Sequence, residues 1–140
     1  MIRFNNDYNH AAHESIYEAM KADQANNYPG YGADEWCTKA AEEIKKLIGR
    51  EDPAIYFFPG ATQANFVVCD AALNPIQSVV CPKTGHINCH EAGSIENTGH
   101  KIIELPSTEG KITAQQVREC ASSYFEHGEA EYLTEPKLVY

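Results

Sequence analysis

The sequence lacks three features that would assign it to a class at once: a long apolar run, a surplus of basic residues, and paired cysteines. No apolar run approaches 18 residues, so no membrane span is predicted. Lys and Arg number 11 against 20 Asp and Glu, and this net charge of −9 argues against nucleic acid or an anionic membrane surface as a partner. The five cysteines are odd in number and form no CxxC motif, so we expect free thiols in a reducing cytoplasm. The polar N-terminus has no apolar signal region.

The chain has 140 residues, 43% of them hydrophobic, which is enough for one domain with a core. Helical spacing of apolar residues predicts helices over 10–22, 35–48, 62–73, 86–96 and 114–124. Asp34 and Thr113 stand where N-caps are expected, and Gly49 where a helix would end. Short apolar runs predict strands over 54–58, 78–81, 101–105 and 137–140. This alternation predicts an α/β fold with a mostly parallel sheet and flanking helices.

A candidate anion site lies at Gly60, Ala61 and Thr62, between the apolar run 55–58 and a predicted helix. Backbone N–H groups at such a helix start, with the Thr62 hydroxyl, could hold a phosphate. The alternative is a plain strand-to-helix turn in which Thr62 only caps the helix. The segment is neither a Walker loop nor a GxGxxG turn, so a nucleotide is not favoured.

The segment GHINCHEAG, residues 85–93, holds two histidines, His86 and His90, that would share one face of a helix. A metal site could use both with Cys89 or Glu91, but the HExxH motif is absent and no third ligand follows at a telling spacing, so we assign no metal ligand. His86 could instead stack on a ligand or act as an acid–base group at the carboxyl edge of a strand. The remaining alternative is two histidines on a helix surface.

Two further segments could form contacts. The loop at residues 28–32 places Tyr28 and Tyr31 among glycines, which suits a binding loop, a subunit contact or an ordinary connection equally well. Asn6 belongs to a polar cluster, NNDY, near the N-terminus. Cys69 and Cys81 lie in apolar runs and are expected to be buried, inert thiols.

Five segments in order carry a resemblance to a known family: NDY…AH, GYGADEWC, FFPGATQAN, GHINCHEAGSIENTGHKI and LPSTEGKIT. They resemble the threonine aldolases and β-eliminating lyases, pyridoxal-phosphate enzymes of the aspartate aminotransferase fold. The resemblance implies the N-terminal part of the large domain of a fold-type-I enzyme. It implies one incomplete domain, with an arm at residues 1–33 and a phosphate-binding α/β portion at residues 34–140.

The resemblance also implies roles for single residues. Gly60, Ala61 and Thr62 match the turn that holds the cofactor phosphate, with Ala61 where the family usually has glycine. His86 matches the histidine that stacks on the pyridine ring and is a candidate base for the substrate hydroxyl. Three matches to substrate-binding positions are His90 near the substrate side chain, Asn6 at the substrate carboxylate, and Tyr31 on a loop that reaches the neighbouring subunit's site.

The activity that the resemblance implies is cleavage of a small β-hydroxy-α-amino acid to glycine and an aldehyde, with pyridoxal 5'-phosphate, by a cytoplasmic homo-oligomer. The alternatives are a β-eliminating lyase or an aminotransferase of the same fold, or a non-catalytic remnant or partner domain. The family's Schiff-base lysine, its pyridine-nitrogen aspartate and its carboxylate-binding arginine all lie beyond the stretch matched here. We therefore expect the 140-residue chain to be an N-terminal fragment that is inactive alone.

Overall fold

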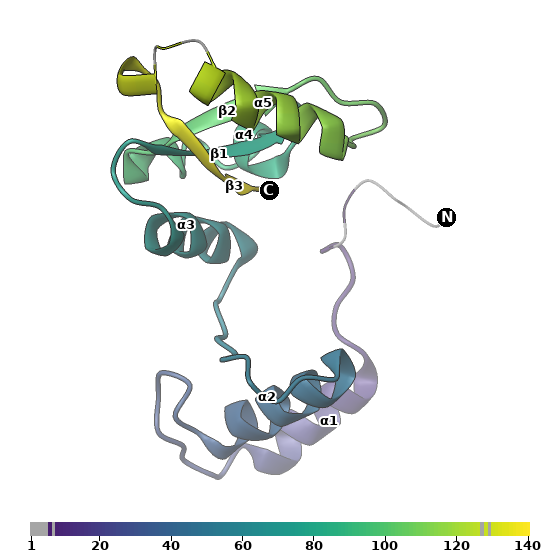
Figure 1. Ribbon diagram of the computed structural model, residues 1–140. Helices are drawn as coiled ribbons and strands as arrows, with labels where there is room; N and C mark the ends of the chain where they lie inside the picture. Colours follow the sequence, from purple (N-terminus) through teal and green to yellow (C-terminus); the bar gives the residue numbers. More distant parts are fainter. Residues whose placement is uncertain (1–5, 7, 127, 129) are drawn as a thin grey trace. The chain divides into compact units, whose positions relative to one another are not determined.

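The chain, seen in a computed structural model, forms two compact units, Met1–Phe57 and Phe58–Tyr140 (Figure 1). The structure describes residues 6, 8–126, 128 and 130–140. Residues 1–5 and 7 of the predicted N-terminal arm lie outside the described residues. The first unit contains two helices, and the second contains the sheet with the helices that cover it.

The first unit contains helices α1 (Glu14–Asp23) and α2 (Glu35–Ile48). The Asp34 side chain accepts a hydrogen bond from the backbone N–H of Cys37 at 2.8 Å, which satisfies one of the free donors at the start of α2. At the other end, Gly49 adopts the left-handed conformation (φ 66°) that a helix C-terminus favours. Both predicted ends of this helix are confirmed.

Helix α1 begins four residues later than the apolar spacing predicted. His13 is its N-cap residue, and the Nδ1 atom of His13 accepts a hydrogen bond from the N–H of Ser15 at 3.3 Å. The helix therefore starts at Glu14, and the predicted start at residue 10 is wrong. The apolar spacing contained no signal for a histidine cap, because Ser, Thr, Asp and Asn are the usual caps.

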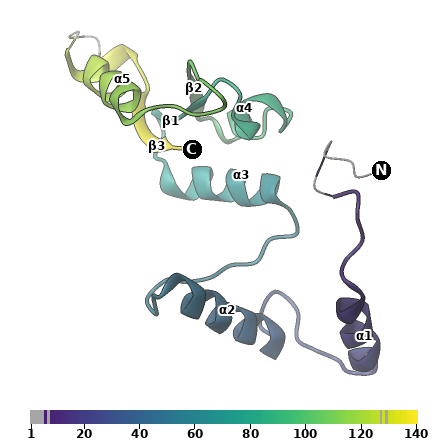
Figure 2. The same cartoon turned by 90° about the vertical axis from the view of Figure 1, so that its right-hand side faces the viewer.

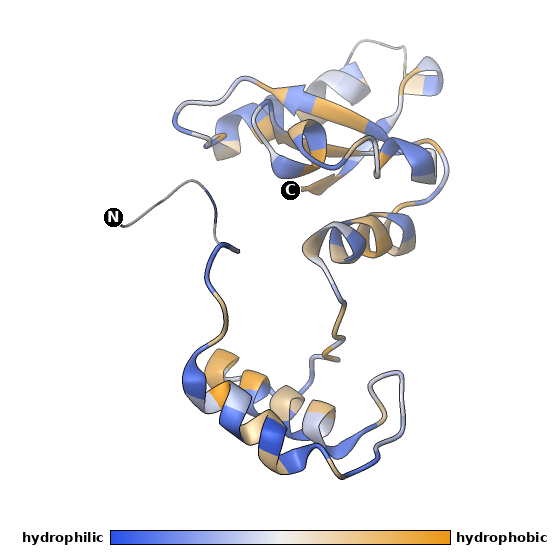
Figure 3. Cartoon of the chain, turned by 180° about the vertical axis from the view of Figure 1, so that it is seen from behind, coloured by the Kyte–Doolittle hydropathy of each residue, from blue (hydrophilic) through white to orange (hydrophobic). Residues whose placement is uncertain are grey.

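The predicted strand at 54–58 is not a strand. The segment joins α2 to α3 and is rich in hydrophobic residues (Figure 3), yet no strand in the described part of the chain pairs with it. Tyr56 is 77% exposed, so the apolar composition of this segment does not make it part of the core. An apolar extended segment becomes a strand only when a neighbour accepts its backbone hydrogen bonds.

The second unit is built on three parallel strands, β1 (Gln77–Pro82), β2 (Lys101–Leu105) and β3 (Glu135–Val139), in the order β2-β1-β3. They confirm three of the four predicted strands and the parallel sheet. Ser78 is aligned with Lys101 on one side and with Pro136 on the other. The β1–β3 register then shifts, so that Val79 lies opposite Leu138. The shift follows Pro136, which has no N–H to donate to the ladder.

Helices cover both faces of this sheet. Helix α5 (Ala114–Glu126) lies on one side, and α4 (His86–Cys89) lies on the other (Figure 2). Helix α3 (Ala61–Ala72) packs near the 3-10 helix η1 (Glu96–Thr98). Such two-sided cover explains why the central strand β1 is an unbroken buried run from Ser78 to Cys81.

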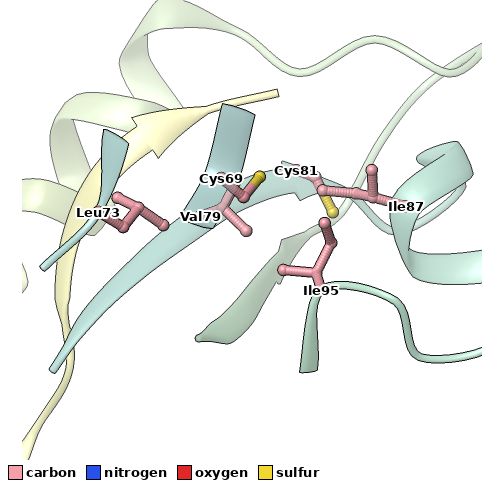
Figure 4. Close-up of a cluster of buried hydrophobic side chains, with 6 residues drawn as sticks. All are labelled: Cys69, Leu73, Val79, Cys81, Ile87 and Ile95. Carbon is pink, nitrogen blue, oxygen red and sulfur yellow. The ribbon is translucent and has the colours of Figure 1, made fainter. Parts of the chain in front are cut away.

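The core lies on the α3 and α4 side of the sheet (Figure 4). Val79 and Cys81 point to this side because alternate residues of a strand share a face. Ile102 and Leu138, which are aligned with Val79 in the neighbouring strands, pack against the same cluster. The cluster is completed by residues from α3, α4 and the segment before η1: Cys69, Leu73, Ile87 and Ile95.

The helix predicted over 86–96 is much shorter. Helix α4 ends at Cys89, and the next helical turn, η1, begins only at Glu96. Between them Ala92 and Gly93 both have positive φ, 51° and 75°, which no α-helix contains. The prediction of one helix over this range is therefore wrong.

Helix α5 begins where the sequence predicted. The hydroxyl of Thr113 accepts a hydrogen bond from the N–H of Gln116 at 3.2 Å, and the Gln116 side chain accepts one from the N–H of Thr113 at 2.8 Å. This reciprocal pair is a capping box. Before it, Thr108 and Lys111 exchange two backbone hydrogen bonds, which close a tight turn within STEGK, residues 107–111.

Candidate functional site

The start of helix α3 forms the first part of the site. Its N-cap residue, Gly60, has extended backbone, and no side chain caps the helix. The backbone N–H of Ala64 donates to the Gly60 carbonyl at 3.1 Å, so the N–H groups of residues 61–63 precede this first helical hydrogen bond. A Cβ atom placed on Gly60 would meet nothing within 4 Å. Free donors beside open space make a helix start that can accept an anion.

Only the helix half of the predicted strand–turn–helix is present. Ala61 and Thr62 open α3 and are exposed, as a phosphate-binding turn requires. The residues before Pro59 are irregular, so the site is formed by the helix start alone. A twelve-residue helix is long enough to present a well-developed dipole at this end.

A tight turn after β1 forms the second part of the site. The N–H of Gly85 donates to the carbonyl of Pro82 at 2.7 Å. A Cβ on Gly85 would lie 3.0 Å from that carbonyl oxygen and 3.4 Å from the Sγ of Cys81, so a side chain there would force the turn open. The turn places His86 directly after the carboxyl end of β1, the edge at which parallel α/β sheets bind ligands.

His86 is held from one side by a buried carboxylate. Its Nδ1 atom lies 2.7 Å from Oε1 of Glu91. The side chain of Glu91 is 0% exposed, whereas that of His86 is 52% exposed. The histidine ring is thus fixed at its inner nitrogen and open to solvent elsewhere.

Two further donors reach the same carboxylate. Asn65, in the second turn of α3, donates from Nδ2 to Oε1 of Glu91 at 2.6 Å. The hydroxyl of Ser94 donates to the other oxygen, Oε2, at 2.8 Å. Because Asn65 belongs to α3 and His86 to α4, Glu91 links the helix that could hold an anion to the histidine.

The hydrogen bonds keep this carboxylate ionised. Burial alone raises the pKa of Glu91, because it disfavours the charged form. The donors act in the opposite direction, with the largest contribution from His86, and the resulting pKa lies below the usual value for a glutamate. Glu91 therefore carries a negative charge at neutral pH despite its burial.

His90 lies beside His86, as their four-residue spacing suggested. It is the C-cap residue that follows α4, and the two ring centroids are 5.6 Å apart with the planes at 64°. This is an edge-to-face contact. The assignment of His90 to the substrate side chain stays a prediction.

The structure brings some of the predicted site residues together. Gly60, Ala61 and Thr62 begin α3, and His86 is joined to the same helix through Glu91 and Asn65. The other two predicted residues belong to the first unit.

In that first unit, the side chain of Asn6 accepts a hydrogen bond from the N–H of Tyr8 at 3.3 Å. Tyr31 is fully exposed with φ 62°. Their roles in substrate binding stay predictions.

None of the three network residues, Asn65, Glu91 and Ser94, was predicted to contact His86 or its carboxylate partner. Glu91 was considered only as a possible metal ligand. Glu91 follows His86 by five positions, a spacing that does not place two residues on one helix face. The early end of α4 at Cys89 turns the chain so that Glu91 lies under His86. The one available signal was the Gly93 that follows, because a glycine with positive φ marks a turn.

Other kinds of site find little support. Burial raises the pKa of the Cys81 thiol to about 11, so this group is protonated at neutral pH and is a poor nucleophile. Within residues 6, 8–126, 128 and 130–140, no group of three or more His, Cys, Asp or Glu residues could hold a metal ion. No helix in that same part of the chain is long and apolar enough to cross a membrane.

Comparison with known proteins also points to a pyridoxal-phosphate enzyme. A family model described as β-eliminating lyase matches residues 9–137. The low specificity L-threonine aldolase of a Pseudomonas species is 30% identical over 107 residues, which cover 75% of this chain and 31% of that protein. The protein of the same description from Pseudomonas aeruginosa is 27% identical over the same shares of both chains.

A solved structure is also similar. The threonine aldolase of Leishmania major superposes with a TM-score of 0.89 at 36% sequence identity, over 96% of this chain and 38% of that one. The predicted fold class, an α/β fold of the fold-type-I pyridoxal-phosphate enzymes, is confirmed by this likeness. The chain spans about a third of the length of the relatives that it matches.

Proposed function

Because the chain belongs to the β-eliminating lyase family, we propose that it forms the phosphate-holding and ring-stacking part of a pyridoxal-phosphate lyase. The proposed reaction is cleavage of a small β-hydroxy-α-amino acid into glycine and an aldehyde. Two relatives described as low specificity L-threonine aldolases support this choice over other reactions of the family.

One observation carries the proposal: the helix start and the histidine are parts of one hydrogen-bonded arrangement. The open N-terminus of α3 suits a phosphate, and Asn65 of the same helix is bonded to the carboxylate that holds His86. A cofactor with a phosphate at one end and a flat ring at the other needs these two features close together. The residues present therefore fit pyridoxal phosphate.

The residues would divide the work as follows. The N–H groups at residues 61–63 and the hydroxyl of Thr62 bind the phosphate, and the ring of His86 packs on the flat face of the cofactor. When bound, the cofactor withdraws electrons from the Cα atom of the amino acid. His86 would take the proton from the β-hydroxyl as the Cα–Cβ bond breaks, so that the C–O group becomes the aldehyde; Cα keeps the electron pair and is then protonated to give glycine. His90, beside it, lies against the substrate side chain.

The two remaining predicted residues have proposed roles of their own. We assign Asn6 to the substrate carboxylate and Tyr31 to the site of a neighbouring subunit, which makes the working enzyme a homo-oligomer. We place this enzyme in the cytoplasm, in keeping with its free thiols. The 140-residue polypeptide by itself would bind the cofactor weakly and without a lysine linkage.

Binding of the cofactor tests the proposal. We expect equilibrium dialysis with the 140-residue chain to show tighter binding of pyridoxal phosphate than of pyridoxal, which lacks the phosphate. Thr62→Val should weaken pyridoxal phosphate about tenfold, because a hydrogen bond to a charged group contributes about 1.5 kcal/mol, and should leave pyridoxal unchanged.

Thr38→Val is the matched control, because Thr38 lies in the first turns of α2, in the other unit. This variant should bind both compounds as the unaltered chain does. Equal affinity for pyridoxal and pyridoxal phosphate would remove the phosphate site from the proposal.

A further inference from the structure

The pairing of a wholly buried glutamate with a half-exposed histidine has a chemical consequence for the histidine. An ionised carboxylate can only accept hydrogen bonds, so each group that contacts Glu91 must donate. Oε1 accepts from Asn65 and lies 2.7 Å from Nδ1 of His86, while Oε2 accepts from Ser94. The Nδ1 atom of His86 must therefore carry a proton.

The position of that proton determines what the rest of the ring can do. A neutral imidazole has one protonated nitrogen and one with a free lone pair. With the proton on Nδ1, the lone pair is on Nε2, and no hydrogen bond within the described residues engages Nε2 of His86. In this tautomer Nε2 is a proton acceptor, as a base requires.

No other group in contact with the ring can impose this choice. The rings of His90 and His86 meet edge to face, and no hydrogen bond joins the two rings among the described residues. The backbone N–H of His90 donates to the carbonyl of His86, which does not involve the imidazole. Glu91 is thus the one side chain in the described part of the chain that is bonded to the imidazole of His86.

We propose that Glu91 is a positioning residue, which holds His86 in the Nδ1–H tautomer so that Nε2 is free to accept a proton. Asn65 and Ser94 fix the carboxylate in turn, and Asn65 ties it to the helix whose start would bind the phosphate. The use of Nε2 on a substrate hydroxyl rests on the proposed function, but the tautomer itself does not.

Nitrogen NMR of the unliganded chain tests this directly. In the ¹⁵N-labelled 140-residue protein, the ring signals of His86 are assigned with a His86→Phe variant, which distinguishes them from those of the other five histidines. At an alkaline pH, where the imidazole ring is neutral, we expect the Nδ1 signal in the protonated range and the Nε2 signal in the unprotonated range. A His86 that carries its proton mainly on Nε2 would overturn the proposal without any variant of Glu91.

Substitution of the glutamate gives the second measurement. In Glu91→Gln the amide can donate as well as accept, so the two His86 signals should move toward each other by a large part of their separation. Glu104→Gln is the matched control, because Glu104 accepts from Asn88 of the same short helix at 3.0 Å and does not contact His86. The tautomer of His86 should be unchanged in this control.

A His86 tautomer that is the same in Glu91→Gln as in the unaltered chain would also overturn the proposal. If Glu91→Gln does not fold, Glu91→Asp withdraws the carboxylate by one methylene group and should still mix the tautomers. Titration of the unaltered chain and of each variant with pyridoxal phosphate tests the proposed function separately from the role of Glu91. Absence of cofactor binding to the unaltered chain counts against the proposed function, whereas the NMR result alone decides the role of Glu91.

Discussion

At the scale of single residues, the main feature of the site is Glu91, to which three of its other side chains are hydrogen-bonded. Glu91 is buried, ionised and held by three donors from three different segments of the second unit. A buried carboxylate without such partners would be strongly unfavourable, so its hydrogen bonds are what make its position possible. Removing its charge should affect stability as well as the histidine.

The stability contributed by Glu91 should depend on pH in a defined direction. Its pKa in the folded chain is lowered from the reference value of 4.5. A lowered pKa gives stability that is present above 4.5 and is lost as the pH falls through the folded-state pKa. Below that pH, protonated Glu91 resembles glutamine.

Urea unfolding of the unaltered chain and of Glu91→Gln provides the measurement. Near pH 6 the unaltered chain should be more stable by about 1.5–3 kcal/mol, the range for hydrogen bonds to a charged group. The difference should shrink as the pH falls below 4.5 and through the lowered pKa of Glu91 in the folded chain. A difference that is constant over this range would show that the charge of Glu91 adds no stability.

At the scale of the elements, the caps and turns are the parts that the sequence predicted well. Asp34 and Thr113 begin their helices, as short polar side chains at such positions usually do. These features are local, because each depends on residues within a few positions. The segment at 54–58 shows the opposite case, since an apolar run cannot reveal whether a distant strand will pair with it.

The candidate site shows the same difference between features set by nearby residues and features set by distant ones. Gly60, Ala61 and Thr62 form a helix start, which the sequence alone indicated, and His86 follows a strand as predicted. Glu91 was missed because its contact with His86 requires the helix to end at Cys89. No periodic pattern describes such a bend.

The turn between β2 and α5 offers a test at this scale. Glu109 and Gly110 have φ of 51° and 74°, the signs that a type I′ turn requires at both central positions. Glu109 adopts this conformation unfavourably, whereas asparagine adopts it readily. We expect Glu109→Asn to stabilise the chain by about 0.5–1 kcal/mol, measured as a higher urea midpoint.

Gly110→Ala is the opposing control. It places a Cβ atom on a residue with positive φ and should lower the urea midpoint. A lower midpoint for Glu109→Asn than for the unaltered chain would show that the turn does not favour asparagine.

At the scale of the whole molecule, the chain covers 31% of the first Pseudomonas relative, and this share limits the activity that we expect of it. The resemblance to the family implies that groups needed for the proposed reaction lie outside the matched stretch. We therefore expect the 140-residue chain, supplied with pyridoxal phosphate and threonine, to release no more glycine than the cofactor alone does. Production of glycine and acetaldehyde by this chain would contradict the expectation.

A chimera provides the positive counterpart. When this chain replaces its aligned segment in the Pseudomonas relative, we expect cleavage of threonine to glycine and acetaldehyde. His86→Phe in that chimera should lower kcat at least about 100-fold, the smaller end of the effect of a general base. Ammonia and a keto acid as products would instead favour a β-eliminating lyase or an aminotransferase.

The central position of β1 also bears on the order in which the second unit folds. Both strands that neighbour β1 come later in the chain. The backbone carbonyl of Gln77 is bonded to the side chain of His100, 23 residues away, just before β2. The side chain of Gln77 donates to Glu135 of β3, 58 residues away. The free-energy cost of the entropy lost on closing the longer loop exceeds the cost for the shorter loop by about 0.8 kcal/mol. The β1–β2 pair should therefore assemble first. Strand β3, which α5 connects to β2, should then join this two-stranded nucleus.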